Sequence, residues 1–154
     1  MADFSGITNF VQLTPEVGTS GQPTREQFDS IARDGYRAVI NLALPTSDHA
    51  IADEGSIVTG LGMSYIHIPV DFAKPTLDDL NAFVGAMRAL EGRKVWVHCV
   101  LNMRVSAFMY LYLKHVRGLD EASSRSPVLK RWEPKMDAAW SQLIATDPAQ
   151  IARG

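Results

Sequence analysis

A cysteine and an arginine stand close together in residues 95–106, which read Val-Trp-Val-His-Cys-Val-Leu-Asn-Met-Arg-Val-Ser. Cys99 follows the apolar residues Val95, Trp96 and Val97 and then His98, and Arg104 stands five positions later. A thiol at a helix N-terminus near a guanidinium ionises more readily, because both positive potentials favour the thiolate. A thiolate is a strong nucleophile near neutral pH, and an arginine can grip two oxygens of a phosphate or sulfate. The pair therefore predicts a site for phosphate or a similar oxyanion.

The surrounding elements predict an α/β fold with a mostly parallel central sheet flanked by helices. Short apolar runs predict strands over 37–42, 64–68 and 94–98. Capping residues and helical spacing predict helices over 24–34, 48–61, 77–90 and 104–116, and two shorter ones at about 120–131 and 135–146. Strands that alternate with helices imply parallel pairing through right-handed crossovers.

This arrangement places Cys99 where parallel sheets bind ligands. Ligands collect beyond the carboxyl ends of the strands, where helix N-termini direct backbone N–H groups outward. Cys99 directly follows the strand at 94–98 and precedes the helix at 104–116. We therefore expect the residues between Cys99 and Arg104 to bind the oxyanion through their backbone N–H groups; they are Val100, Leu101, Asn102 and Met103.

Length and composition restrict the class of protein. The 154 residues, 46% hydrophobic and 21% charged, predict one globular domain over 1–154. A net charge of −2 argues against a nucleic-acid binder, which needs a basic face. No apolar run approaches the roughly 20 residues of a membrane span, and the first residues lack the pattern of a signal peptide. The single cysteine cannot form an internal disulfide, so we expect a free thiol in the cytoplasm.

The segment 95–106 resembles the signature H-C-x5-R-[ST] of the cysteine-dependent protein tyrosine and dual-specificity phosphatase superfamily. The segment Ser20-Gly21-Gln22-Pro23, followed by a helix and a strand, looks like the opening of its small bacterial members. The resemblance covers roughly residues 10–117. It implies a dual-specificity-phosphatase-like fold, a phosphorylated substrate whose class the sequence leaves open, and no metal or organic cofactor.

The resemblance also implies roles for individual residues. Cys99 would attack phosphorus to form a thiophosphate intermediate, and Arg104 would hold the phosphate oxygens. The family places its general acid shortly after the strand that corresponds to 64–68, which makes Asp71 the matching residue. Ser106 has the family spacing of the hydroxyl that assists the leaving thiolate, and His98 is expected to hydrogen-bond the loop and set its shape.

The loop departs from the signature in two ways. Four residues separate Cys99 from Arg104, where the family has five, and the loop has no glycine. Either the loop has lost one residue and tightened, or its length is kept and Val105 takes the usual arginine position. Asn102 could replace the glycine, because asparagine tolerates a left-handed backbone better than most residues.

Two other functions remain open from the sequence. A catalytically inactive module could use the altered loop to bind a phosphorylated or sulfated ligand. A gap of four residues also resembles that of many rhodanese-like sulfurtransferases, in which the cysteine carries a persulfide.

A second group of polar residues lies in the predicted helix at 48–61. Asp48, His49, Asp53 and Glu54 are types that can bind a metal. However, they form two adjacent pairs, and adjacent residues on a helix point in different directions. We therefore interpret this group as a solvated helix face and expect no metal site.

Overall fold

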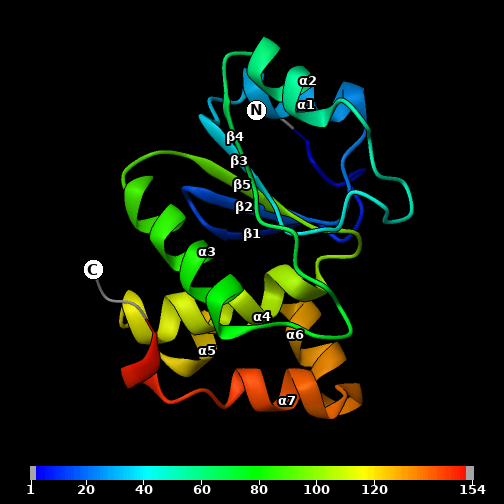
Figure 1. Ribbon diagram of the computed structural model, residues 1–154. Coiled ribbons are helices and arrows are strands. Elements are labelled where there is room, and N and C mark those ends of the chain that lie inside the picture. Colours follow the sequence, from blue (N-terminus) through cyan, green and yellow to red (C-terminus); the bar gives the residue numbers. More distant parts are fainter. Residues whose placement is uncertain (1–2, 152–154) are drawn as a thin grey trace.

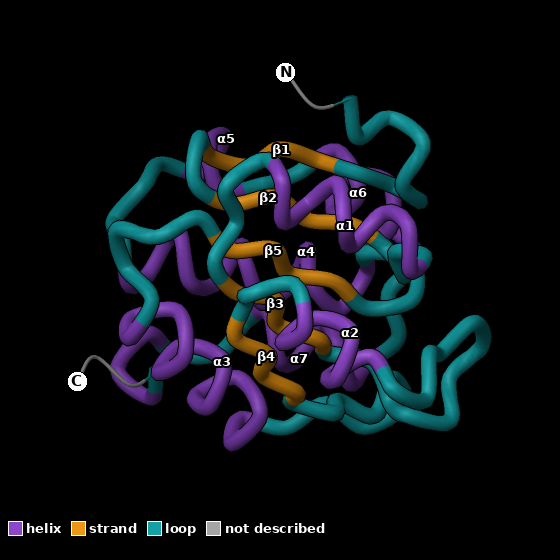
Figure 2. Tube along the Cα trace, turned by 90° about the horizontal axis from the view of Figure 1, so that it is seen from above, coloured by secondary structure: helices purple, strands orange, loops and turns teal. Residues whose placement is uncertain are grey.

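A five-stranded sheet forms the centre of the computed structural model, which describes residues 3–151. The strand order is β1-β2-β5-β3-β4, as Figure 2 shows. The strands are β1 (Val11–Thr14), β2 (Val17–Ser20), β3 (Ala38–Asn41), β4 (Ser64–His67) and β5 (Val95–His98). Only β1 and β2 pair antiparallel, and the other three neighbouring pairs are parallel. The mostly parallel α/β sheet is therefore confirmed, whereas the β1–β2 hairpin was absent from the sequence prediction.

The middle strands are buried on both faces. Every residue of β3 and β5 is buried, and these two strands pair with each other in parallel. Alternate side chains enter different cores: Val95 and Val97 pack into one cluster, and Trp96 packs into another on the opposite face. Such double burial is typical of parallel strands covered by helices, and it explains the continuous apolar run before Cys99.

Helices cover both faces of the sheet (Figure 1). On one face lie α1 (Arg25–Arg33) and α2 (Glu54–Gly60), and on the other lie α3 (Leu77–Ala89) and α4 (Met103–Leu111) with the C-terminal helices. α1 begins at the predicted place, because Thr24 caps it with a reciprocal side-chain hydrogen bond to Gln27. Within residues 3–151, no helix has the length and apolar content that crossing a bilayer requires.

α2 is shorter than the sequence predicted. The prediction began the helix at residue 48, but the structure begins it at Glu54. Residues 44–50 instead form turns, in which Ser47 N–H donates to the Leu44 carbonyl. His49 has a φ of 64°, which a right-handed helix excludes. The predicted helix over 48–61 is therefore wrong in its first half.

The chain after α4 folds into several short helices. α4 continues as a π-helical turn (Tyr112–Val116) that stops before Gly118, where φ is 73°. The predicted helix at 120–131 is two helices, α5 (Glu121–Ser124) and α6 (Pro127–Trp132), because Ser126 and Pro127 start a new helix. A 3₁₀ turn (Glu133–Lys135), α7 (Ala138–Ile144) and a second 3₁₀ turn (Pro148–Gln150) follow.

Candidate active site

The loop from Cys99 to Asn102 joins β5 directly to α4. Asn102 is the N-cap of α4 and has a left-handed backbone with a φ of 69°, as its residue type predicted. Its side-chain Nδ2 donates to the backbone oxygen of Asn9 at 2.8 Å and lies 3.2 Å from Thr19 Oγ1. The side chain therefore fixes the turn that brings the chain from the loop into the helix.

Three successive carbonyl groups of this loop accept hydrogen bonds from residues outside it. The Cys99 oxygen lies 3.1 Å from His98 Nδ1, the Val100 oxygen accepts from Gln22 N–H at 3.0 Å, and the Leu101 oxygen accepts from the side chain of Asn9 at 3.0 Å.

Because the N–H of a trans peptide points opposite to its carbonyl, the next three N–H groups face away from these partners. They belong to Val100, Leu101 and Asn102, and within residues 3–151 none of them has a hydrogen-bond acceptor. A row of free N–H groups before a helix N-terminus is suited to bind an oxyanion.

Arg104 is a buried cation beside this loop. Only 6% of its surface is exposed, its guanidinium donates to the Val70 carbonyl at 2.8 Å, and it lies 5.6 Å from the centre of the Phe72 ring. In the described part of the chain it makes no ion pair with a carboxylate. A buried charge needs a counter-charge, so the site is suited to an anionic ligand.

Cys99 and Arg104 line the same pocket, which has a volume of about 560 Å³. Val105, the alternative position for the arginine, is fully buried in the core. The pocket is lined by residues of the Cys99 loop, of the start of α4 and of the β3–α2 connection, and by one aromatic side chain. These residues are Leu44, Thr46, Ser47, Asp48, Phe72, Cys99, Val100, Leu101, Met103 and Arg104. Phe72 and Leu101 are the two large hydrophobic side chains exposed among the described residues, and both line this pocket.

The other predicted site residues lie around this pocket and do not line it. Asp71 is exposed, and its carboxylate accepts from the Ala73 N–H at 2.9 Å, an arrangement typical of a turn. Ser106 is buried, and its hydroxyl donates to the Met103 carbonyl at 2.7 Å within α4.

His98 lies beneath the loop in a buried network that the sequence did not indicate. Its Nε2 is 2.6 Å from Glu54 Oε2, and the other oxygen of Glu54 accepts from the Gln22 side chain at 2.7 Å. Glu54 is only 3% exposed, so its interpretation as part of a solvated helix face is wrong. Its role could not be read from spacing, because His98 is 44 residues away along the chain.

The network shifts the pKa values of its members. Burial raises the pKa of Glu54, but the hydrogen bonds and charge of His98 and the hydrogen bonds of Gln22 and Tyr65 outweigh it, and the net pKa is lowered. Burial and the neighbouring Glu54 carboxylate raise the pKa of Tyr65 to about 12, against the opposing hydrogen bond of Asn41. Glu54 is therefore stabilised as a carboxylate.

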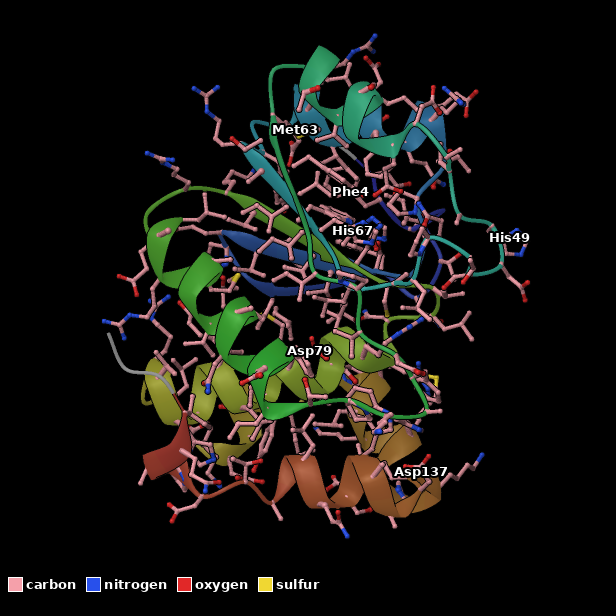
Figure 3. The ribbon with its side chains drawn as sticks, viewed as in Figure 1. Phe4, His49, Met63, His67, Asp79 and Asp137 are labelled. Carbon is pink, nitrogen blue, oxygen red and sulfur yellow. The ribbon has the colours of Figure 1, made fainter. Side chains whose placement is uncertain are left out.

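The remaining candidates for metal binding are separated in space. Asp48 lines the pocket of Cys99, whereas Figure 3 places His49 at the outer edge of the β3–α2 connection. Asp53 forms an exposed ion pair with Arg25 at 2.6 Å. Among residues 3–151, no group of three His, Cys, Asp or Glu side chains is placed to hold a metal ion.

Comparison with known proteins places this chain in a family. Residues 12–143 match a family model described as a DSP-PTPase phosphatase fused to NAD⁺ kinase. Two curated proteins of Xylella fastidiosa strains, both described as beta-lactamase hydrolase-like, are 33% identical over 98 residues. That match covers 61% of this chain and 22% of each relative, so the chain spans only a minor part of their length.

Solved structures are similar over most of the chain. A DUF442 protein of Shewanella putrefaciens CN-32, assigned as a phosphatase, is 37% identical with a TM-score of 0.81, and the match covers 91% of each chain. The core catalytic domain of the PP-IP phosphatase SIW14 from S. cerevisiae, in complex with citrate, is 14% identical with a TM-score of 0.67; the match covers 91% of this chain and 85% of that one. At 14% identity this likeness concerns the fold. Together with the family model, the Shewanella structure shows that the chain belongs to the DSP-PTPase phosphatase family.

Proposed function

We propose that this protein hydrolyses phosphate monoesters through a covalent intermediate on Cys99. The observation that carries the proposal is the pocket that Cys99 and Arg104 line together. Among residues 3–151 the buried Arg104 has no carboxylate partner, and the backbone N–H groups of Val100 and Leu101, which belong to the same lining, have no acceptor. Arg104 and the N–H groups would bind the phosphate oxygens, where they stabilise the charge of the transition state. The family membership supports phosphatase chemistry in general.

In the first step, the Cys99 thiolate attacks phosphorus, the S–P bond forms and the P–O bond to the leaving group breaks. In the second step, a water molecule attacks phosphorus, the S–P bond breaks, and phosphate and the thiolate are released. A general acid would protonate the leaving oxygen in the first step and, as a carboxylate, accept the proton of the water in the second.

We assign this acid to Asp71. The position of its neighbours supports the assignment, because the preceding Val70 carbonyl binds Arg104 and the following Phe72 lines the pocket. The residues before and after Asp71 in the chain therefore both contact the site. Asp48, which lines the pocket from the β3–α2 connection, is the competing carboxylate and the matched control.

Hydrolysis of an aryl phosphate between pH 5 and 8 tests the proposal. Cys99→Ser should abolish turnover, and Arg104→Ala should lower kcat/KM by roughly a hundredfold or more, because a positioned charge donor is lost. Arg33→Ala, which changes an exposed arginine on α1, should leave kcat/KM unchanged. Full activity in Cys99→Ser would contradict the proposal.

Substrates with poor and good leaving groups distinguish the two candidate acids, Asp71 and Asp48. Asp71→Asn should slow hydrolysis of an alkyl phosphate far more than that of nitrophenyl phosphate, since a good leaving group needs no proton. Asp48→Asn should affect both substrates alike. The reverse pattern would assign the acid to Asp48.

The same experiments distinguish the two alternative functions. A binding module would bind phosphate through Arg104 without turnover, and a sulfurtransferase would take a persulfide on Cys99 from thiosulfate. The comparisons favour neither. Because a free thiolate must stay reduced, we place the proposed activity in the cytoplasm. No cofactor is needed for either step.

A further inference from the structure

A second pocket, here called the side pocket, adjoins the pocket that Cys99 lines. It has a volume of about 220 Å³, and Leu101 and Met103 belong to the lining of both pockets. Trp132 of α6 also lines the side pocket, and its ring stacks on that of Phe72, which lines the Cys99 pocket, with centroids 5.6 Å apart. The two pockets therefore share part of their walls, and the shared part is apolar.

The side pocket carries two positive charges. Arg131 of α6 and Lys135 of the following 3₁₀ turn both line it, and there is no Asp or Glu among the described residues of its lining. Within residues 3–151 neither cation forms an ion pair. Glu133, the carboxylate between them in the chain, is paired with Arg125 instead. Although the whole chain has a net charge of −2, this pocket attracts anions.

A third pocket adjoins the Cys99 loop but lacks this charge pattern. It has a volume of about 460 Å³ and shares Val100 with the Cys99 pocket. Arg25 lines it but is paired with Asp53 at 2.6 Å, and Glu26 belongs to the same lining. The uncompensated positive charge next to the Cys99 pocket therefore lies in the side pocket.

Two cations in one pocket suit a phosphate better than a carboxylate. A phosphate ester carries a charge of about −1.5 to −2 at pH 7 and offers three acceptor oxygens. It can therefore accept paired hydrogen bonds from Arg131 and still bind the ammonium group of Lys135. A carboxylate has a single charge and would leave one of the two cations without a counter-charge. The apolar wall of Leu101 and Met103 suits a short carbon skeleton between two anionic groups.

We propose that the side pocket binds a second phosphate group of the substrate, which is then a small molecule with two phosphate esters. One phosphate is held by Arg104 beside Cys99, and the other by Arg131 and Lys135. The inference rests on the proposed function and names the substrate class for the same site. Interactions with a group remote from the reacting phosphorus also stabilise the transition state, so they raise kcat/KM for such substrates.

Diol bisphosphates of increasing length test the inference. The substrates are the bisphosphates of propanediol, butanediol and hexanediol, with butyl phosphate as the reference. The wild type should prefer at least one bisphosphate over butyl phosphate in kcat/KM by about tenfold, and Arg131→Gln and Lys135→Gln should each lower this preference about threefold to tenfold, because a charge-assisted hydrogen bond is lost. Lys130→Gln is the matched control and should keep the preference, since Lys130 is an exposed cation of the same helix outside the side pocket.

Three results would overturn the inference. They are equal kcat/KM values for all four substrates, an equal loss of preference in Lys130→Gln, and a preference for a phosphopeptide with acidic neighbours but not for the bisphosphates.

Binding to Cys99→Ser keeps this test separate from the test of the proposed function. Isothermal titration calorimetry on this variant measures the affinity for each substrate without turnover. The side pocket predicts tighter binding of a bisphosphate than of butyl phosphate, and equal affinities would overturn the inference. If the wild type hydrolyses none of the substrates while the difference in affinity remains, the proposed function fails and the side pocket stands.

Discussion

Asn102 adopts a left-handed backbone conformation, which is unfavourable, and its side chain makes favourable hydrogen bonds. A left-handed residue other than glycine costs about 1–2 kcal/mol, but asparagine tolerates this conformation and its Nδ2 also binds the N-terminal segment at Asn9. The residue therefore fixes the loop at the point where the last free N–H groups meet α4. Its Oδ1 is buried without a hydrogen-bond partner among the described residues. The side-chain amide is therefore held by the hydrogen bonds that its Nδ2 donates.

Substitution of Asn102 separates these two effects. Asn102→Ala should destabilise the protein by about 1–3 kcal/mol, because the strain remains and the hydrogen bonds are lost. Asn102→Gly should cost less, since glycine adopts this backbone freely. Urea unfolding measures both. Equal losses would contradict the importance of the left-handed backbone.

Glu54 makes the free energy of unfolding depend on pH. Its folded pKa is lowered from 4.5, so its stabilising contribution is present above that pH and is lost as the pH falls through the folded value. Glu54→Gln should therefore be less stable than the wild type at pH 7, and the difference should narrow below about pH 4.5. Urea unfolding at pH 7, 5, 4 and 3 checks this. A constant difference across this range would show that the carboxylate charge is not involved.

At the level of single residues, the local pattern predicted which side chains share the pocket but not which residues support the loop. Cys99 and Arg104 stand five positions apart, and the structure brings them into one pocket as their types suggested. Glu54 and Gln22 could not be assigned, because their contacts join segments that are distant along the chain. Glu54 was misinterpreted for the same reason: helical spacing does not reveal which face meets a buried histidine.

The connection between β2 and α1 packs closely against the Cys99 loop. A Cβ atom on Gly21 would lie 2.2 Å from the Val100 oxygen, and the N–H of Gly21 donates to the Thr8 carbonyl at 2.7 Å. Only glycine allows the two segments to approach so closely. This explains why the Ser20-Gly21-Gln22-Pro23 segment belongs with the loop, although the two are almost 80 residues apart.

Alanine at Gly21 tests this contact. Gly21→Ala should destabilise the protein by about 1–3 kcal/mol and lower kcat/KM, because the loop must move. Gly60→Ala is the control, since a Cβ there meets nothing within 4 Å, and it should be neutral or slightly stabilising. Thermal unfolding and aryl phosphate hydrolysis check both variants. Wild-type activity in Gly21→Ala would show that the loop does not need this approach.

At the scale of elements, strong local signals gave correct predictions and weak ones did not. The capped helix α1 and the apolar strands β3 and β5 lie where the sequence placed them. The β1–β2 hairpin was missed because several residues of both strands are polar; β2 is placed by its pairing with β5, and β1 by its pairing with β2. α2 was overextended, because helical spacing in residues 48–53 competes with turns that only the folded chain stabilises.

The C-terminal helices connect to the candidate active site through aromatic side chains. Trp140 of α7 is fully buried, and its indole N–H donates to the Phe72 carbonyl at 2.7 Å. The Phe72 ring stacks on Trp132 with centroids 5.6 Å apart and lies beside Arg104. The loop that carries Asp71 is therefore held in place by Trp132 and Trp140, which lie 60 and 68 positions after Phe72 in the chain.

Removal of the indole donor should loosen this loop. Trp140→Phe keeps most of the apolar contact but leaves the Phe72 carbonyl without its partner, so we expect a loss of about 1–3 kcal/mol. We also expect kcat/KM to fall more with an alkyl phosphate than with nitrophenyl phosphate, because the proposed acid moves with the loop. Urea unfolding and steady-state kinetics measure the two effects. Equal losses on both substrates would contradict the link between α7 and Asp71.

In the proposed reaction Cys99 becomes covalently phosphorylated, and trapping this intermediate tests the proposal directly. The protein is mixed with an aryl phosphate, quenched in acid within milliseconds and analysed by intact and peptide mass spectrometry. Asp71→Asn should accumulate more intermediate, because the second step lacks its base. We expect the peptide that contains Cys99 to gain the mass of one phosphoryl group. Rapid hydrolysis without any such adduct, or with the same rate in Cys99→Ser, would contradict it.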